Sequence, residues 1–349
     1  MIALSSIQSD SVSVTVDYFT GSLFLKKYLI NGVVKRFWPI SNSILRKRHV
    51  WRKQFSKSCL KYYKNQTPDI TIINMSGLVS PFSIDLSKVI LKNNKQYIAM
   101  IGGMSMAYND DTYEYYKKAH HIIVHTELQK KEILNHNMFS NLDIKVLPLG
   151  IDINKFRPVD SFKNEIEGKL LCVSRITPLK QIEIAIETLK HLKINNFKKA
   201  GLTIIGPISD KTYYNQLKRQ INELSLNNDV IFLGAIHQEQ ILSYYQNSDL
   251  LLLPSKTESF GMVMVEAMSC GTPVATLHGT GGPDEIILNN FNGILTSEER
   301  YSESVLSLLL DNEKYKILRQ HSRTTILKKY SIEETTRVLK ESINSALNS

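Results

Sequence analysis

Residues 250–271 read LLLLPSKTESFGMVMVEAMSCG and decide the fold of the second half of the chain. Four leucines followed by Pro-Ser predict a buried strand that ends in a polar loop. Ser259 is the expected N-cap of a helix that runs to Ser269, with Gly271 as its C-terminal stop. A buried strand that passes through a loop into a helix is the building unit of a parallel α/β sheet.

Two carboxylates stand in this stretch, with seven residues between them. Glu258 lies in the loop and Glu266 lies inside the helix. The backbone N–H groups around Phe260 and Gly261, at the helix N-terminus, favour an anion, and a glycine lets a phosphate or sugar come close. Carboxylates accept hydrogen bonds from sugar and ribose hydroxyls. Each glutamate taken singly is equally an ordinary loop or helix residue.

Two further segments place polar groups after predicted strands. Residues 170–180 read LLCVSRITPLK, so Arg175 and Lys180 follow a strand and are placed to clamp a diphosphate. Residues 279–285 form a glycine-rich turn with a proline at the start of a helix. Glu285 in that turn is a candidate donor-site residue, although the helix dipole alone explains an acid there.

Short apolar runs alternate with helical patterns along the whole chain, which predicts parallel sheets covered on both faces. The expected strands are residues 70–74, 97–101, 122–125, 145–147, 170–174, 202–205, 230–233, 250–253 and 274–277. We predict an α/β fold of two doubly wound Rossmann-like domains, residues 1–166 and 167–330, that face each other across a cleft. Residues 331–349 are expected to form a helix that packs back on the first domain.

The charge of the 349-residue chain is unevenly distributed. Of a net charge of +10, residues 1–167 carry +9, and residues 18–68 hold 12 Lys and Arg and no acid. Aromatic residues alternate with these cations, so residues 18–67 either bind an anionic membrane surface or form a core-facing helix with a solvated cationic face. No nucleic-acid-binding motif accompanies them, and we expect no nucleic-acid partner.

Three widely spaced cysteines exclude a disulfide framework and fit a reducing compartment. No apolar run approaches the length of a membrane span, and the first residues lack the basic region of a signal peptide. We expect a cytoplasmic protein, peripheral on the inner face of the plasma membrane if the basic segment binds lipid.

These elements together resemble the retaining nucleotide-sugar glycosyltransferases of family 4 (group 1), which have the GT-B fold. The family's E-x7-E signature is matched by Glu258-SFGMVMV-Glu266. Its interdomain P-x-G-[VI]-D and F-x-P elements are matched within residues 148–158, and its Gly-Gly-x-x-Glu element by residues 281–285. The resemblance covers residues 70–345 and is most specific in residues 145–290.

The resemblance implies a nucleoside diphosphate sugar as donor and a saccharide or lipid-linked acceptor. Arg175 and Lys180 would bind the diphosphate, and Glu258 would support the transition state at the sugar. Glu266 would hold the ribose, and the backbone of residues 259–261 would contact the sugar or phosphate. Glu285 would be an ancillary donor-site residue. A bacterial surface polysaccharide or glycolipid is the expected product.

Neither a resident cofactor nor a metal is expected, because the chain has no D-x-D motif and Asp110-Asp111 is isolated. Residues 101–104 lack the histidine that the family often has there, and the first 65 residues do not match its pattern. Two alternatives stay open. One is an epimerase or hydrolase of the same fold, and the other is a non-catalytic nucleotide-sugar binder.

Overall fold

The computed structural model describes residues 6–9, 12–41, 53–75, 77–103, 106–159 and 165–348. The chain divides into two compact units, Met1–Pro148 with Ile332–Ser349, and Leu149–Ser331. The first division falls before the boundary after residue 166 that the sequence predicted. The reason is that Ile151 and Phe156 are buried in the core of the second unit.

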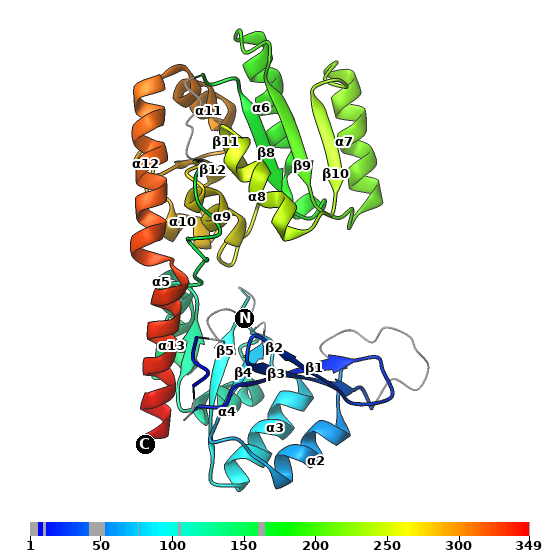
Figure 1. Cartoon of the computed structure of the whole chain (residues 1–349), viewed down its shortest axis with the longest axis vertical. Helices are drawn as coiled ribbons and strands as arrows, with labels where there is room; N and C mark the ends of the chain where they lie inside the picture. Colours follow the sequence, from blue (N-terminus) through cyan, green and yellow to red (C-terminus); the bar gives the residue numbers. More distant parts are fainter. Residues whose placement is uncertain are drawn as a thin grey trace. The chain divides into compact units, whose positions relative to one another are not determined.

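The second unit is built on a six-stranded parallel sheet in the order β10-β9-β8-β11-β12-β13 (Figure 1). The strands are β8 (Lys169–Val173), β9 (Gly201–Ile205), β10 (Val230–Gly234), β11 (Leu250–Leu253), β12 (Val274–Leu277) and β13 (Ile294–Thr296). All residues of β11 and β12 are buried, as continuous apolar strands require. The strand order reverses between β8 and β11, and this reversal defines the topological switch point of the sheet.

Helices cover both faces of this sheet, since alternate strand residues enter two different cores. Leu170, Leu250 and Leu252 pack with α6, α7 and α11, whereas Leu171 and Leu251 pack with α8, α9 and α12. The helices are α6 (Ile182–Ile194), α7 (Lys211–Glu223), α8 (Gln238–Asn247), α9 (Met262–Ser269), α10 (Gly282–Ile286), α11 (Tyr301–Leu310) and α12 (Asn312–Lys329). The two ends of the unit meet, because the Ile151 N–H donates to the Tyr330 carbonyl at 2.9 Å.

The first unit contains a four-stranded parallel sheet in the order β4-β5-β6-β7. These strands are β4 (Ile70–Met75), β5 (Gln96–Ile101), β6 (Ile122–Val124) and β7 (Ile144–Val146). One face packs against α2 (Lys57–Asn65), α3 (Pro81–Lys92), α4 (Asp110–Lys117) and α5 (Glu127–Leu134). The other face packs against α13 (Ile332–Leu347), whose Leu339 and Ala346 join Ile98 and Ile123 in one core.

A second, small sheet of the first unit has no counterpart among the predicted strands. It consists of β1 (Thr15–Thr20), β3 (Val33–Pro39) and β2 (Lys26–Ile30), in that spatial order. β1 runs parallel to β3, and β2 pairs with β3 as a hairpin. Its turn is Asn31-Gly32, both with positive φ, which is the signal of a two-residue hairpin.

Two of three general expectations can be compared with the structure. Cys59, Cys172 and Cys270 are buried and free of disulfides. No helix within the described ranges is both long and apolar enough to cross a membrane. The cationic stretch from Arg46 to Arg52 lies outside the described residues.

Candidate functional site

Predicted site residues follow the two strands that border the switch point. The chain leaves β8 through Arg175, which is exposed, and a 3-10 turn, η3 (Pro178–Lys180), brings Lys180 back toward the sheet. Glu258 lies in the loop that follows β11. In open parallel sheets, the carboxyl ends of the strands on either side of a switch point form the ligand-binding edge. The structure therefore puts both predicted cations and the first predicted carboxylate at that edge.

Lys180 and Glu258 are in direct contact. The Lys180 ammonium donates to Glu258 Oε1, and each side chain is only 14% exposed. The Ser255 hydroxyl donates to the same carboxylate oxygen at 3.2 Å. The Lys256 N–H donates to the Leu179 carbonyl at 2.9 Å, so the backbones of the two loops are also joined. The pair holds a cation and a carboxylate at fixed positions on the edge of the sheet.

The backbone of Glu258 is fastened to the glycine-rich turn that follows β12. Its N–H donates to the Thr280 carbonyl at 2.7 Å, and its carbonyl accepts from the Gly282 N–H at 2.8 Å. The two loops approach so closely that a Cβ on Gly282 would lie 2.5 Å from Cα of Phe260. A glycine at position 282 is therefore required by contact with backbone, which cannot move aside as a flexible side chain can.

Asp284 shapes this turn and was not among the predicted site residues. Its carboxylate accepts the N–H groups of Gly279, Thr280 and Gly281 at 2.6, 2.8 and 2.9 Å. The sequence pointed instead to Glu285, which lies on α10 and is partly buried. An acid three positions after a turn glycine, where it can cap the backbone behind it, is the signal that could have identified Asp284.

The N-terminus of α9 differs from the sequence prediction. The helix begins at Met262 and its N-cap is Gly261, so the prediction of Ser259 as N-cap was wrong. Gly261 has φ +88°, a conformation that favours glycine, and its carbonyl accepts the Met264 N–H at 2.8 Å. The Phe260 side chain is buried in the core. The positive end of the α9 dipole therefore lies at residues 259–261.

Glu266 is on α9 and is bonded to α8. Its Oε2 accepts from the Tyr245 hydroxyl at 2.7 Å and its Oε1 accepts from the Gln238 amide at 3.1 Å. Burial raises the pKa of the Glu266 carboxyl, while the hydrogen bonds from Tyr245 and Gln238 act in the opposite direction. Tyr245 and Gln238 have no signal in the sequence beyond their helical pattern, because only tertiary packing brings them to Glu266.

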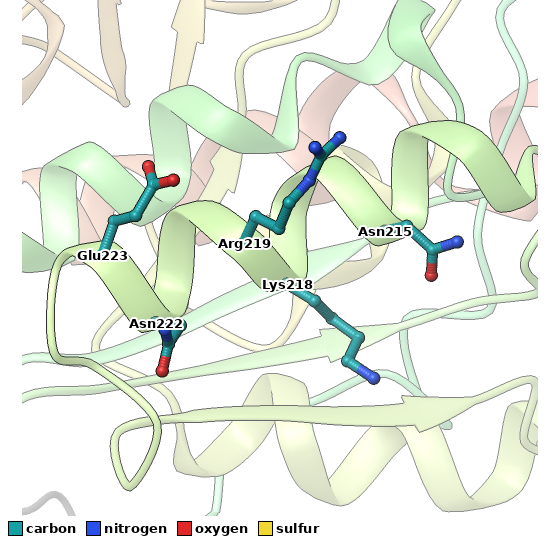
Figure 2. A pocket seen from close by; sticks show the side chains of 5 residues that line it. All are labelled: Asn215, Lys218, Arg219, Asn222 and Glu223. Atoms are coloured by element: carbon teal, nitrogen blue, oxygen red, sulfur yellow. The ribbon is translucent and has the colours of Figure 1, made fainter.

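Two other features bear on the site. Within the described ranges, no three His, Cys, Asp or Glu side chains are grouped so that they could hold a metal ion. Figure 2 shows a surface hollow lined by Asn215, Lys218, Arg219, Asn222 and Glu223, all from α7. None of the predicted site residues lines this hollow, so the candidate site is defined by the strand ends.

Comparison with known proteins supplies the family. Residues 154–325, most of the second unit, match the family model described as glycosyl transferases group 1, and this segment belongs to that family. A probable sucrose-phosphate synthase of Thermosipho melanesiensis is 30% identical over 65% of this chain and 54% of its own length. A D-inositol 3-phosphate glycosyltransferase of Mycolicibacterium smegmatis is 30% identical over 56% and 46%. The chain thus spans about half the length of these curated relatives.

The fold is shared with solved glycosyltransferases. HepE of Anabaena in complex with UDP superposes with a TM-score of 0.73 at 17% identity, over 89% of this chain and 86% of HepE. The two-unit architecture is the GT-B fold, as the sequence predicted.

Proposed function

We propose that the chain is a glycosyltransferase that moves a sugar from a nucleoside diphosphate sugar to a saccharide or lipid-linked acceptor. The observation that carries the proposal is the Lys180–Glu258 pair at the switch point of a group 1 domain. The names of the relatives support the donor class, since HepE was solved with UDP and two relatives are named for sugar-transfer products or acceptors.

The cations give this edge a means to stabilise a leaving group. When the bond between sugar and diphosphate breaks, negative charge grows on the diphosphate. Arg175 and Lys180, together with the positive end of α9, would stabilise that charge more in the transition state than before it. Lys180 is held in place by Glu258, so little reorganisation is needed when the donor arrives.

The carboxylates serve the neutral parts of the donor. Glu258 is fixed by hydrogen bonds to the Thr280 and Gly282 backbones. Its carboxylate would accept hydrogen bonds from hydroxyls of the transferred sugar. Glu266 would hold the ribose hydroxyls, and Tyr245 orients its carboxylate for that task. Residues 259–261 would contact sugar or phosphate through their backbone. Glu285 would be an ancillary residue of the donor site.

Retention of configuration, chemistry without a metal, and a role in bacterial surface polysaccharide or glycolipid assembly complete the proposal. Resemblance to the E-x7-E family supports these three points, and Arg175 and Lys180 would neutralise the diphosphate in place of a metal. Peripheral association with an anionic membrane surface would bring the enzyme to a lipid-linked acceptor.

The test begins with a thermal-shift screen of the full chain against UDP- and GDP-sugars. A donor at about 100 times its Kd adds about 2.7 kcal/mol of stability. The donor that binds is then assayed with free sugars, sugar phosphates, inositol phosphate and glycolipids as acceptors. Glu258→Ala and Arg175→Ala should each lose at least about 10²-fold in transfer rate.

Matched controls are available on the same unit. Glu239→Ala and Arg219→Ala remove an exposed acid and an exposed arginine outside the candidate site, and both should keep the wild-type rate. Near-full transfer by either site variant would contradict the site assignment. Release of free sugar at the same rate with and without every acceptor would instead identify a hydrolase.

A further inference from the structure

An unusual concentration of exposed apolar side chains lies on β2 of the small sheet and on the loop that leads into it. Leu23, Phe24 and Leu29 are 85%, 77% and 72% exposed, and Tyr28 is 51% exposed. Single exposed apolar residues are ordinary on soluble proteins, whereas a contiguous group marks an interaction surface. We call Leu23, Phe24, Lys26, Lys27, Tyr28 and Leu29 the hairpin surface.

β2 is an exposed edge strand of the small sheet. β2 pairs with β3 alone within its sheet, and all five of its residues are exposed. The remainder of the sheet is anchored on one face, where Asp17 accepts from Arg36 Nε at 2.6 Å, Trp38 Nε1 at 2.7 Å and the Tyr63 hydroxyl at 2.7 Å. These bonds tie β1 and β3 to α2, while β2 stays exposed at the edge of the sheet.

Positive charge accompanies the apolar side chains. Lys26 and Lys27 are both exposed on β2, and no acid occurs between Asp17 and Asp69. Asp17 itself is engaged by Arg36, whose side chain is 7% exposed. Exposed apolar side chains beside two lysines, in a stretch of sequence without acids, are complementary to an anionic lipid surface. Lysines on an edge strand also oppose pairing with the edge of a second copy.

We propose that the hairpin surface docks on an anionic lipid bilayer, with Leu23, Phe24 and Leu29 entering the interface and Lys26 and Lys27 contacting lipid phosphates. The inference builds on the proposed transfer to a lipid-linked acceptor and gives it a location. It differs from a basic helix that lies on the membrane, because Cys59 and Tyr63 of α2 are turned into the core. The lipid-facing element is strand β2 together with the loop before it.

The experiment measures co-sedimentation of the full chain with phosphatidylcholine vesicles and with vesicles of equal parts phosphatidylcholine and phosphatidylglycerol. The Lys26→Gln/Lys27→Gln variant should bind the anionic vesicles roughly 30-fold more weakly than wild type. Phe24→Ser/Leu29→Ser should weaken binding at least about tenfold, and these exposed positions leave the fold intact. High salt should reduce wild-type binding.

Matched controls separate the surface from net charge and general stickiness. Lys88→Gln/Lys92→Gln removes two exposed lysines from α3 of the same unit, and Ile194→Ser/Leu310→Ser removes two exposed apolar residues from the second unit. Both should sediment with vesicles like wild type. Donor-induced thermal shifts should be unchanged in all four variants, so loss of vesicle binding is distinguishable from failure of the proposed function.

The proposal is overturned if the wild-type chain fails to bind anionic vesicles, or if the hairpin variants bind as well as wild type. It is also overturned if the hairpin variants instead dissociate a dimer in analytical ultracentrifugation, which would make the surface a contact between copies. Binding of a soluble glycan that is lost in the hairpin variants, without vesicle binding, would likewise reject the lipid assignment.

Discussion

Replacing Gly282 with alanine is expected to separate the two loops that carry the candidate site. The added Cβ would lie 2.5 Å from both Cα and the carbonyl oxygen of Phe260, so backbone must move. The movement stretches the bonds from Gly282 N–H to Glu258 and from Glu258 N–H to Thr280. Two hydrogen bonds at about 1 kcal/mol each, with about 1–3 kcal/mol for overpacking, give a loss of roughly 3–5 kcal/mol.

The assay is calorimetric unfolding of the full chain, with and without the donor that stabilises it. In a unit of this size the loss corresponds to a decrease of the melting temperature on the order of 10 °C. Donor stabilisation should fall as well, because Glu258 is displaced. Gly279→Ala is the control, since its Cβ would meet nothing within 4 Å and should cost only about 1 kcal/mol for its positive φ. Wild-type melting and donor binding in Gly282→Ala would refute this reasoning.

Two further predictions concern pH. Burial raises the pKa of Glu266, so its contribution to stability is present at low pH and is lost as the pH rises through that pKa. Glu266→Gln should therefore gain stability relative to wild type as the pH rises, measured by thermal melts across the acid range, while donor binding weakens. Burial lowers the pKa of His121 from 6.5 to about 4, so its contribution is lost as the pH falls through this interval. On acidification, the melting temperature of His121→Phe should fall less than that of wild type. The melting temperature of the exposed control His237→Phe should fall as much as that of wild type.

Much of the second unit could be predicted from sequence because its strands are buried on both faces. The apolar runs at 250–253 and 274–277 have the bounds of β11 and β12 as predicted. Continuous burial leaves an unbroken apolar run, which is easier to recognise than an alternating pattern. The positions of Lys180 and Glu258 at strand ends followed from the same runs, and their direct contact is the structural addition.

The remainder depended on contacts between distant residues. The hairpin of β2 and β3 was marked by Asn31-Gly32, but its exposed apolar residues follow no amphipathic pattern. The N-cap of α9 is Gly261 because the chain enters the helix with positive φ. The sequence suggested Ser259 instead, since serine is a more frequent N-cap residue. The hydrogen-bond partners of Glu266 lie on another helix, and no pattern in the neighbouring sequence predicts them.

The meeting of the two ends of the second unit has a consequence for how such a protein can change. Ile151 is joined to Tyr330 by a hydrogen bond and to Ser331 by an isolated bridge, so the segment enters and leaves at neighbouring points. A segment with adjoining ends can be cut out, recombined or replaced as a cassette without redesigning the chain around it. Under the proposed function, exchange of this one segment would change the donor preference, while β2 and its lysines stay in the first unit.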